Sequence, residues 1–501
     1  MISAFANSMK VPELRQRILF TLAMIVVARL GVHIPLPGVN VAVLDSWMQA
    51  QQNDGSGMNA LAAVLTIFSG GGLQQCGIFA LGIMPYISAS IMTQLLTAVV
   101  PKWQKMVRED GGRQKMTKWT RGIAIGIAIV QGWFLVVSLE NPARLPFLQG
   151  IEQYGNLVMF PGFGFAFSTI LIIVAGTMFL MWIGDQITEK GIGNGVSLII
   201  GVNIIHSLPG ALTIAWKTLV HPAPNEINPM GAFALVALIA FLMLVIALVV
   251  TVTQAQRRIA VQYAKRLTGG ANGKMFNAPT QYLPLKLNYS GVMPVIFATA
   301  ILSLSQMLVH QVFPGTEIDR IVNDWCSQTS YPYYIGASLM IFFFSYFWVA
   351  TMFQPAQIAE DLKRNGGYIP GIRPGPPTCL FLDQTMQRLT FSGSLFLTLI
   401  FFIPSLMTVN HWVSPIVAQF FGGTSLLILV GVLLDVMRQV ETTLLQRNYD
   451  GFLKKGKMRG RYNHLQGTGV AANSSLVMTM WIGISVVLIA GAIAAYVYTN
   501  Y

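Results

Sequence analysis

Apolar stretches of membrane-spanning length recur along the chain and alternate with shorter polar segments. A helix needs roughly 20 predominantly apolar residues to cross the hydrocarbon core of a bilayer. The pattern predicts eleven such helices, over residues 18–36, 76–98, 120–139, 164–183, 196–215, 231–253, 291–313, 333–355, 389–409, 417–437 and 475–498. We therefore expect an all-α, polytopic membrane protein.

Composition agrees with this pattern. The 501 residues are 54% hydrophobic and 10% charged, too few charges to solvate a globular surface of that size. No small-residue cleavage site follows the first apolar stretch, so we expect this helix to be retained rather than removed as a signal peptide. The three cysteines lie far apart without CxxC spacing, which argues against a metal site or a disulfide framework.

Basic residues divide unevenly between the two sides of the predicted membrane. If the N-terminus is cytosolic, only Arg29, Arg144, Lys217 and Arg320 fall outside, and the other 28 of the 32 Lys and Arg residues fall on the cytosolic side. This positive-inside bias predicts a cytosolic N-terminus, and an outer C-terminus if the eleventh helix crosses. The net charge of +13 is thus mainly an orientation signal, and secondarily an indication of anionic partners.

One eight-residue pattern occurs twice, about two hundred residues apart. Residues 82–89 and 291–298 read GIMPYISA and GVMPVIFA, which share Gly, a β-branched residue, Met, Pro, Ile and Ala at equivalent positions. Proline inside a helix removes a backbone hydrogen bond, so the repeat predicts two kinked helices in related halves of the molecule. Gly and Pro are common in membrane helices in general, but the shared frame favours a repeat.

The segment between the first two predicted helices is apolar but too short to cross. Residues 57–72 end in three consecutive glycines. Irregular backbone at membrane depth is tolerated only where protein or a water-filled cavity surrounds it. Two interpretations are equally consistent with the pattern: a short helix that folds back into the protein on a glycine tether, and an amphipathic helix on the membrane surface.

Two cytosolic segments are longer than a connection requires. In the first, residues 257–266 have strand character, 269–273 form a turn, and 281–288 return as a second strand. In the second, 359–364 predict the end of a helix, and 366–375 an irregular loop that presents Arg373. We expect both to dock an acidic partner, although ordinary solvated basic loops are the alternative.

Chemistry within the predicted helices is sparse. Charged residues at a helix centre cost about 2.5 to 3.5 kcal/mol each on insertion scales, and only Arg29 and Asp435 lie near the ends of spans. No phosphate loop, HExxH motif or His/Cys cluster occurs, so we expect neither catalysis nor a cofactor nor a metal. Isoleucines recur at four-residue spacing at mid-depth, but spacing alone does not show that they converge.

Several longer motifs are specific to one family. They are FSGG at 68–71, FALGIMPYISAS at 79–90, ITEKGIGNG at 187–195, QRR at 256–258, LPLK at 283–286, GIRPG at 371–375 and FGGTSLL at 421–427. On these motifs the chain resembles the SecY (SecY/Sec61-alpha) family, the channel subunits of protein translocases, over nearly all of residues 10–461. The resemblance implies an hourglass channel of two inverted five-helix halves, over residues 1–230 and 231–440.

The resemblance also implies roles for individual residues. The family's pore ring maps onto six isoleucines, Ile83, Ile87, Ile200, Ile204, Ile296 and Ile428. Its plug maps to about 59–75, with Asn59, Leu61, Leu65 and Phe68 in the plug and Gly70, Gly71 and Gly72 as its hinge. Its lateral gate, between the second and seventh helices, maps onto Pro85, Ser88, Gln94, Pro294, Phe297 and Thr299.

The expected partners follow from the same resemblance. Arg257, Arg258, Lys265, Arg266 and Arg373 fall in loops that would dock a ribosome or a SecA-like ATPase motor, and the residues do not separate these two alternatives. SecE-like and SecG-like small membrane subunits, signal peptides, nascent chains and membrane lipid complete the expected partners. The implied function is passage of unfolded polypeptides across the bacterial plasma (inner) membrane and release of membrane helices into lipid.

The C-terminal region departs from the family's ten-helix core. A basic tail over 441–474 precedes the eleventh apolar stretch, in the terminal segment 475–501. Gly483 and Gly491 offer small-residue faces for helix packing, so we expect this helix either at the channel periphery or as a lipid-facing anchor. A coupled secondary transporter also uses inverted repeats, but the scarcity of charge at mid-depth disfavours it. A structural scaffold would not explain the plug-like segment or the long basic loops.

Overall fold

Ten long helices account for most of the residues that the computed structural model describes. It describes residues 11–44, 46–47, 70–73, 75–108, 111–142, 151–219, 231–263, 281–313, 316–326, 330–409, 417–418 and 424–454. The long helices are α2 (Pro12–Val32), α5 (Met84–Val99), α7 (Gly112–Glu140), α8 (Phe163–Lys190), α9 (Gly195–Leu219), α10 (Gly231–Gln254), α11 (Met293–Val312), α13 (Tyr331–Met352), α15 (Pro376–Val409) and α17 (Thr424–Lys454). They overlap the first ten predicted spans; the eleventh, 475–498, lies outside the described residues.

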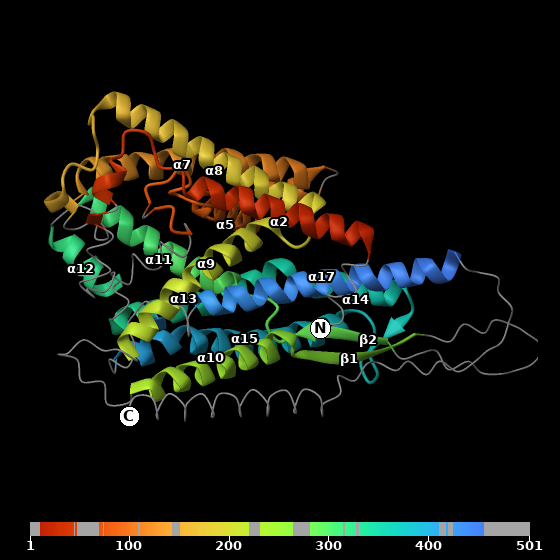
Figure 1. The fold of residues 1–501 in the computed structure, drawn as a ribbon. Helices are drawn as coiled ribbons and strands as arrows, with labels where there is room; N and C mark the ends of the chain where they lie inside the picture. The colour runs from red at the N-terminus through yellow and green to blue at the C-terminus, as the bar shows by residue number, and fades with distance from the viewer. Residues whose placement is uncertain are drawn as a thin grey trace, which may run out of the picture.

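Shorter elements connect these helices. They are α6 (Pro101–Arg108), η2 (Ile151–Tyr154), β1 (Gln256–Tyr263), β2 (Gln281–Lys286), α12 (Glu317–Cys326), α14 (Pro355–Arg364) and β3 (Gly367–Tyr368). Figure 1 places the strands and α14 at one end of the helix bundle and α12 at the opposite end. The charge pattern assigns both long loops to the cytosolic side, and the strands and α14 that belong to them lie at the same end of the bundle.

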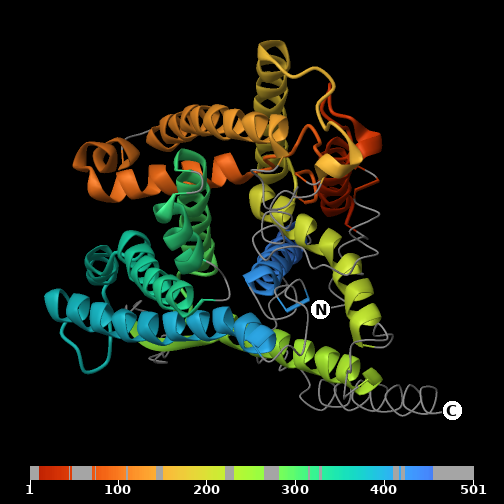
Figure 2. The same cartoon turned by 90° about the vertical axis from the view of Figure 1, so that its left-hand side faces the viewer.

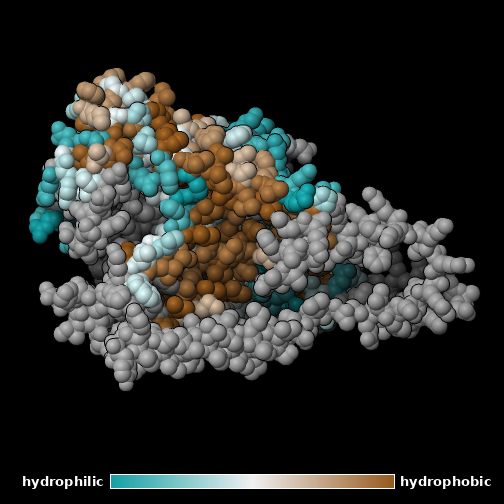
Figure 3. All heavy atoms as spheres, in the orientation of Figure 1, coloured by the Kyte–Doolittle hydropathy of each residue, from teal (hydrophilic) through white to brown (hydrophobic). Residues whose placement is uncertain are grey.

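Six described segments, in α7, α8, α9, α10, α13 with α14, and α15, are long and apolar enough to cross a membrane. The helix α2 carries four charged residues, and α5 has only 16 residues. For these reasons neither is long and apolar enough to cross a membrane by the same measure. Figure 3 shows apolar side chains gathered between two hydrophilic regions on the face drawn. Large exposed apolar residues follow the outer faces of several helices, for example Ile335, Leu339 and Phe343 on α13.

The repeated Gly-x-Met-Pro pattern adopts the same backbone conformation in both halves. Gly82 and Gly291 have φ values of 55° and 63°, and in each case the helix begins two residues later, with proline in its first turn. Proline is favoured there because the first helical N–H groups have no partner within the helix. The prediction of kinks at Pro85 and Pro294 is therefore wrong: these prolines start α5 and α11.

Prolines do lie inside two other helices, Pro209 in α9 and Pro404 in α15. Helix ends also differ from the predicted spans. Residues 76–83 form turns rather than the first part of a helix, α15 begins 13 residues before the predicted 389, and α17 extends into the predicted basic tail at 441–454. Hydropathy locates apolar segments well, but it does not mark where a helix continues beyond the hydrocarbon layer.

An ion pair joins two of the long helices, and only one of its two residues, Arg121, lies within a predicted span, 120–139. Arg121 of α7 and Asp185 of α8 form an ion pair with Nη2 and Oδ2 2.5 Å apart, both partly exposed. Oppositely charged groups on neighbouring helices satisfy each other, so this pair ties α7 to α8 without leaving an isolated charge.

The two strands of the predicted hairpin are present in a three-stranded sheet with the order β2-β1-β3, and the predicted turn at 269–273 lies outside the described residues. β1 pairs antiparallel with β2, so that Arg257 faces Leu285 and Ile259 faces Leu283. β1 also pairs with β3, through Gln262 with Tyr368. Part of the second long loop, predicted to be irregular, is thus a strand, and the sheet joins both loops.

Two of the core clusters each lie within one half of the chain, and another contains residues of both halves. One cluster is drawn entirely from residues 36–173 and another entirely from residues 241–434. A third contains residues of both halves, from Ala28 to Val432. Seen along the helices, Figure 2 shows the red to yellow N-terminal helices above α10, α13 and α15, with α11 (green) reaching toward α5 (orange).

We predict that glycine is required where the repeated pattern has positive φ, but not in exposed helix faces. Gly291→Ala should lower the free energy of unfolding by about 1 kcal/mol, because a left-handed conformation strains an L-residue. No atom lies within 4 Å of a Cβ built at Gly291, so packing adds nothing to this cost.

Gly126 of α7 is the matched control, since its Cβ position is equally open and its backbone is helical. Gly126→Ala should raise the free energy of unfolding by about 0.5 to 1 kcal/mol. Thermal unfolding of the detergent-purified variants tests both. Equal effects of the two substitutions would contradict the backbone explanation.

Candidate functional site

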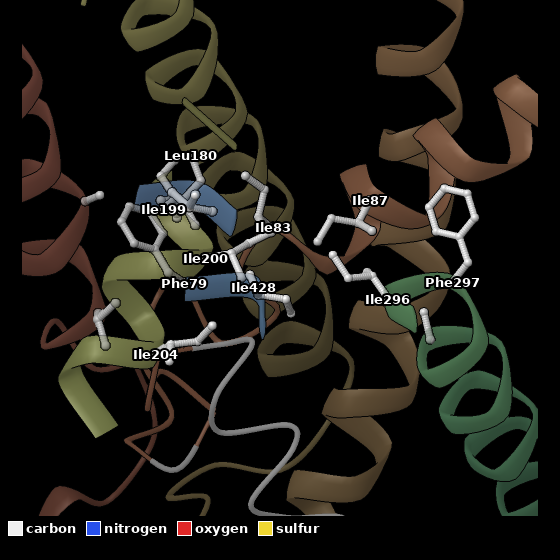
Figure 4. Close-up of a cluster of buried hydrophobic side chains, with 14 of the residues drawn as sticks. Phe79, Ile83, Ile87, Leu180, Ile199, Ile200, Ile204, Ile296, Phe297 and Ile428 are labelled. Carbon is white, nitrogen blue, oxygen red and sulfur yellow. The ribbon is translucent and has the colours of Figure 1, made fainter. Parts of the chain in front are cut away.

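Six isoleucines from four separate stretches of the chain meet in one buried cluster. Ile83 and Ile87 come from the start of α5, Ile200 and Ile204 from α9, Ile296 from α11 and Ile428 from α17, and all are buried in the cluster shared by the two halves. In Figure 4, Ile83, Ile200 and Ile428 lie close together, and Ile87 lies beside Ile296. The structure thus brings together the residues that the family resemblance assigns to a pore ring.

Local sequence explains how two of these residues share a face. The turn at Gly82 and Pro85 starts α5 so that Ile83 accepts a backbone hydrogen bond from Ile87, with N and O 3.1 Å apart. Residues four apart on a helix point in the same direction. The equivalent turn starts α11 at Met293 and places Ile296 in its first turn.

The cluster consists of apolar side chains. Phe79, Leu180 and Ile199 belong to it as well and were not predicted. Their apolar character is common to most residues of these helices, so nothing in the sequence distinguishes them. The described residues contain no group of three or more His, Cys, Asp or Glu that could hold a metal. Such a site can exclude water and ions, but it offers no acid, base or nucleophile.

The predicted gate residues lie on α5 and α11, whose starts meet at the isoleucine cluster. Pro85 and Pro294 are buried at the helix starts. Phe297 packs edge-on against Phe344 and Trp348 of α13, with ring centroids 5.8 and 5.5 Å away. These contacts attach α11 to its own half of the molecule.

Polar gate residues do not join the two helices. Gln94 donates to Ser90 on its own helix at 3.2 Å, and the Thr299 hydroxyl donates to backbone carbonyls within α11. Ser88 is partly buried on α5. Among the described residues, none of these side chains forms a hydrogen bond from α5 to α11, so the contacts between the two helix starts are apolar.

The predicted glycine hinge lies against two polar side chains. Gly70 and Gly71 are buried and have φ values of 65° and 87°, and Gly72 is also buried. Arg29 Nη1 donates to the Gly70 carbonyl at 3.0 Å and to Asn203 Oδ1 at 3.3 Å. The plug residues Asn59, Leu61, Leu65 and Phe68 lie outside the described residues.

Asn203 was not predicted, although a signal was present. It is an amide within an apolar helix, one residue before Ile204 and three after Ile200. A polar side chain in that position needs a partner, because an unpaired buried amide is costly. The identity of the partner depends on the tertiary structure, which brings α2 and residue 70 to α9.

The basic residues of the long loops stand on a packed base. Ile259 and Leu285 of the sheet pack with Phe353, Leu382 and Met386 near the ends of α13 and α15. Arg257 and Arg258 project from β1 and are exposed. The predicted docking residues Lys265 and Arg266 lie outside the described residues.

Arg373 occupies a short loop with defined geometry. Gly371 and Gly375 flank it with φ values of 83° and 109°, and the Thr378 hydroxyl donates to the Arg373 carbonyl at 2.8 Å. The side chain of Arg373 is exposed. Its backbone is therefore held in place while the guanidinium is available to a partner. Arg373 follows β3, which pairs with β1, by five residues.

Comparisons with known proteins agree with this architecture. The SecY family model matches residues 77–437. The Streptomyces galbus protein translocase subunit SecY is 39% identical over 458 residues, covering 91% of this chain and 100% of the relative. The match to the family model includes α5, α9, α11 and the first part of α17.

Solved structures share the fold at low sequence identity. A structure described as a protein conducting channel has a TM-score of 0.57, is 19% identical, and matches over 87% of this chain and 94% of its own. Sec61 in the canine ribosome-channel complex has a TM-score of 0.54, 18% identity and the same coverage. With the family model, the near full-length relative and this fold in agreement, the chain belongs to the SecY family.

Proposed function

We propose that this chain is the protein-conducting channel of a bacterial translocase. It passes unfolded secretory polypeptides across the plasma membrane and releases membrane helices sideways into lipid. The observation that carries this proposal is the convergence of six isoleucines, from both halves of the chain, in one buried cluster. Membership of the SecY family supports the same assignment.

An isoleucine ring suits such a channel physically. β-branched side chains are stiff at χ1, so they form a closed apolar constriction that resists water and ions. The ring has no hydrogen-bonding group that would bind a passing chain. A sequence-independent substrate such as an unfolded polypeptide can therefore move through it without being held.

The remaining parts of the site complete the mechanism. The segment 59–75 serves as the plug on the outer side, with the glycines at 70–72 as its hinge. The starts of α5 and α11 form the lateral gate, which separates to expose a hydrophobic segment to lipid. The inverted halves, 1–230 and 231–440, move relative to each other through their shared cluster, giving the hourglass form of the channel.

Energy for movement comes from partners, because the described residues of the site present no catalytic group. We propose that Arg257, Arg258 and Arg373 dock a ribosome or a SecA-like ATPase at the cytosolic end. The ribosome-bound setting of the canine Sec61 neighbour supports the first of these. SecE-like and SecG-like subunits complete the complex, and the helix at 475–498 packs at its periphery with the C-terminus outside.

We predict that removal of the plug opens the channel. Ion conductance across a planar bilayer should rise sharply when residues 59–75 are deleted from the reconstituted full-length protein. The intact protein should leave the bilayer tight. If neither form conducts ions, although both are folded, a sealing role for this segment is contradicted.

We predict that a polar group in the ring breaks the seal. Ile204→Asn should raise conductance about tenfold or more, since burying an unpaired amide costs about 1 to 3 kcal/mol in the closed state. Ile205 is its matched control, because it is the next residue on α9 and is 48% exposed, whereas Ile204 is 0% exposed. Ile205→Asn should leave the bilayer tight; leakage from both would argue against a specific ring.

We predict that Arg373 contributes directly to docking. Arg373→Ala should weaken ribosome binding and lower the slope of log affinity against log salt by about 1, as expected when one phosphate contact is lost. Arg364→Ala is the control, because Arg364 is exposed on the neighbouring α14 and already pairs with Glu360 at 3.7 Å. Co-sedimentation across a salt series measures both. An unchanged salt slope for Arg373→Ala would exclude this contact.

A further inference from the structure

The hinge glycines are held by a charged side chain near the end of α2. Arg29 lies three residues before Val32, the last residue of that helix, and its Nη1 donates to both the Gly70 carbonyl and Asn203 Oδ1. These two acceptors belong to segments 133 residues apart in sequence. One guanidinium therefore connects α2, the hinge and α9.

Arg29 has no acidic partner in the described part of the chain. The ion pairs among those residues involve other arginines, and the Nη2 of Arg29 is buried without a hydrogen-bond acceptor there. A partly buried cation without a carboxylate depends on the neutral acceptors that it has. The two contacts of Nη1 are therefore worth more than ordinary surface hydrogen bonds.

The position of Asn203 links this contact to the isoleucine cluster. Asn203 is buried on α9, next to Ile204 and within one turn of Ile200. Any displacement of the hinge away from α9 separates the Gly70 carbonyl from Arg29. The arrangement therefore responds to the movement that a plug must make to clear the ring.

The fit around Gly70 is tight. A Cβ built there would overlap Asn203 Oδ1 and lie 2.6 Å from Arg29 Nη1. A Cβ at Gly71 would meet nothing closer than His206 Nε2, at 4.0 Å. Both glycines have positive φ, so a side chain at either position strains the backbone. Only a side chain at position 70 would also displace Arg29.

We propose that Arg29 and Asn203 form a latch that holds the plug hinge in the closed channel. This inference rests on the proposed channel function and adds two positioning residues to it. In the closed state Arg29 donates to the hinge carbonyl, and in the open state that hydrogen bond is absent. The strength of the latch thus sets how often the channel opens without a substrate.

Conductance of the reconstituted full-length protein, measured without substrate, tests the latch. Arg29→Ala, Arg29→Lys and Asn203→Ala should each raise the frequency of opening, about ten- to hundredfold for Arg29→Ala, as expected for loss of hydrogen bonds to a charged group. Lysine keeps the charge but lacks the planar fork that serves two acceptors. Arg15→Ala, an exposed arginine on the same helix, is the control and should not change the frequency.

The two hinge glycines give an internal comparison that does not alter the charge. Gly70→Ala should raise the opening frequency well above that of Gly71→Ala, although both substitutions strain the backbone. If Arg29→Ala fails to fold, as judged by size-exclusion chromatography and thermal unfolding, this pair and Asn203→Ala decide the question.

Hydrogen exchange separates failure of the latch from failure of the channel proposal. The amides of Gln75 and Gly77 bond to the Gly71 and Gly72 carbonyls, and their exchange should accelerate in Arg29→Ala. If deletion of 59–75 opens the channel but folded Arg29→Ala and Asn203→Ala change neither opening nor exchange, the latch is excluded. If exchange is faster in Arg29→Ala but deletion of 59–75 does not open the channel, the contact between Arg29 and the hinge is supported. The sealing role of the plug is then excluded.

Discussion

Backbone hydrogen bonding in an apolar environment governs this structure. A helix satisfies its own N–H and C=O groups, which explains why nearly every apolar stretch is helical. The chain leaves this arrangement before α5, where the described residues 70–73 and 75–83 form turns instead of a helix. There the backbone is satisfied by a neighbouring segment: Leu36 donates to Cys76 at 2.9 Å, and Ile78 donates to Ile34 at 2.9 Å. This packed irregular segment leads from the hinge to the start of α5, so the isoleucines at 83 and 87 depend on it.

The isoleucine cluster performs two roles that conflict. It packs the two halves together, as any core does, and in the proposed function it must also part to admit a polypeptide. Each half has a cluster of its own, drawn from residues 36–173 and 241–434, which does not depend on the shared one. The halves can therefore keep their internal packing while the contacts between Ile87 and Ile296 change. This division gives a physical basis for movement without unfolding.

One polar contact lies where movement is proposed. Arg29, Asn203 and the Gly70 carbonyl form a small polar contact beside an otherwise apolar cluster. Hydrogen bonds are directional, so they specify one position of the hinge more sharply than apolar contacts can. At the other end of the molecule, the sheet and its apolar base hold Arg257 and Arg258 outward. Polar interactions thus define positions, while apolar packing supplies the closure.

The amino-acid sequence determined the helices, the hairpin and the family, because hydropathy, strand propensity and long motifs are local properties. It also identified the repeated pattern at 82–89 and 291–298, but proline was assigned the wrong place in the helix, since starting and kinking a helix use the same residue. Ile83 and Ile87 could be placed on one face from their spacing. Their meeting with Ile200, Ile296 and Ile428 could not, because it depends on how distant helices pack. The partner of Arg29 was equally hidden: sequence shows a charge near a helix end, and only the tertiary structure brings Gly70 and Asn203 within its reach.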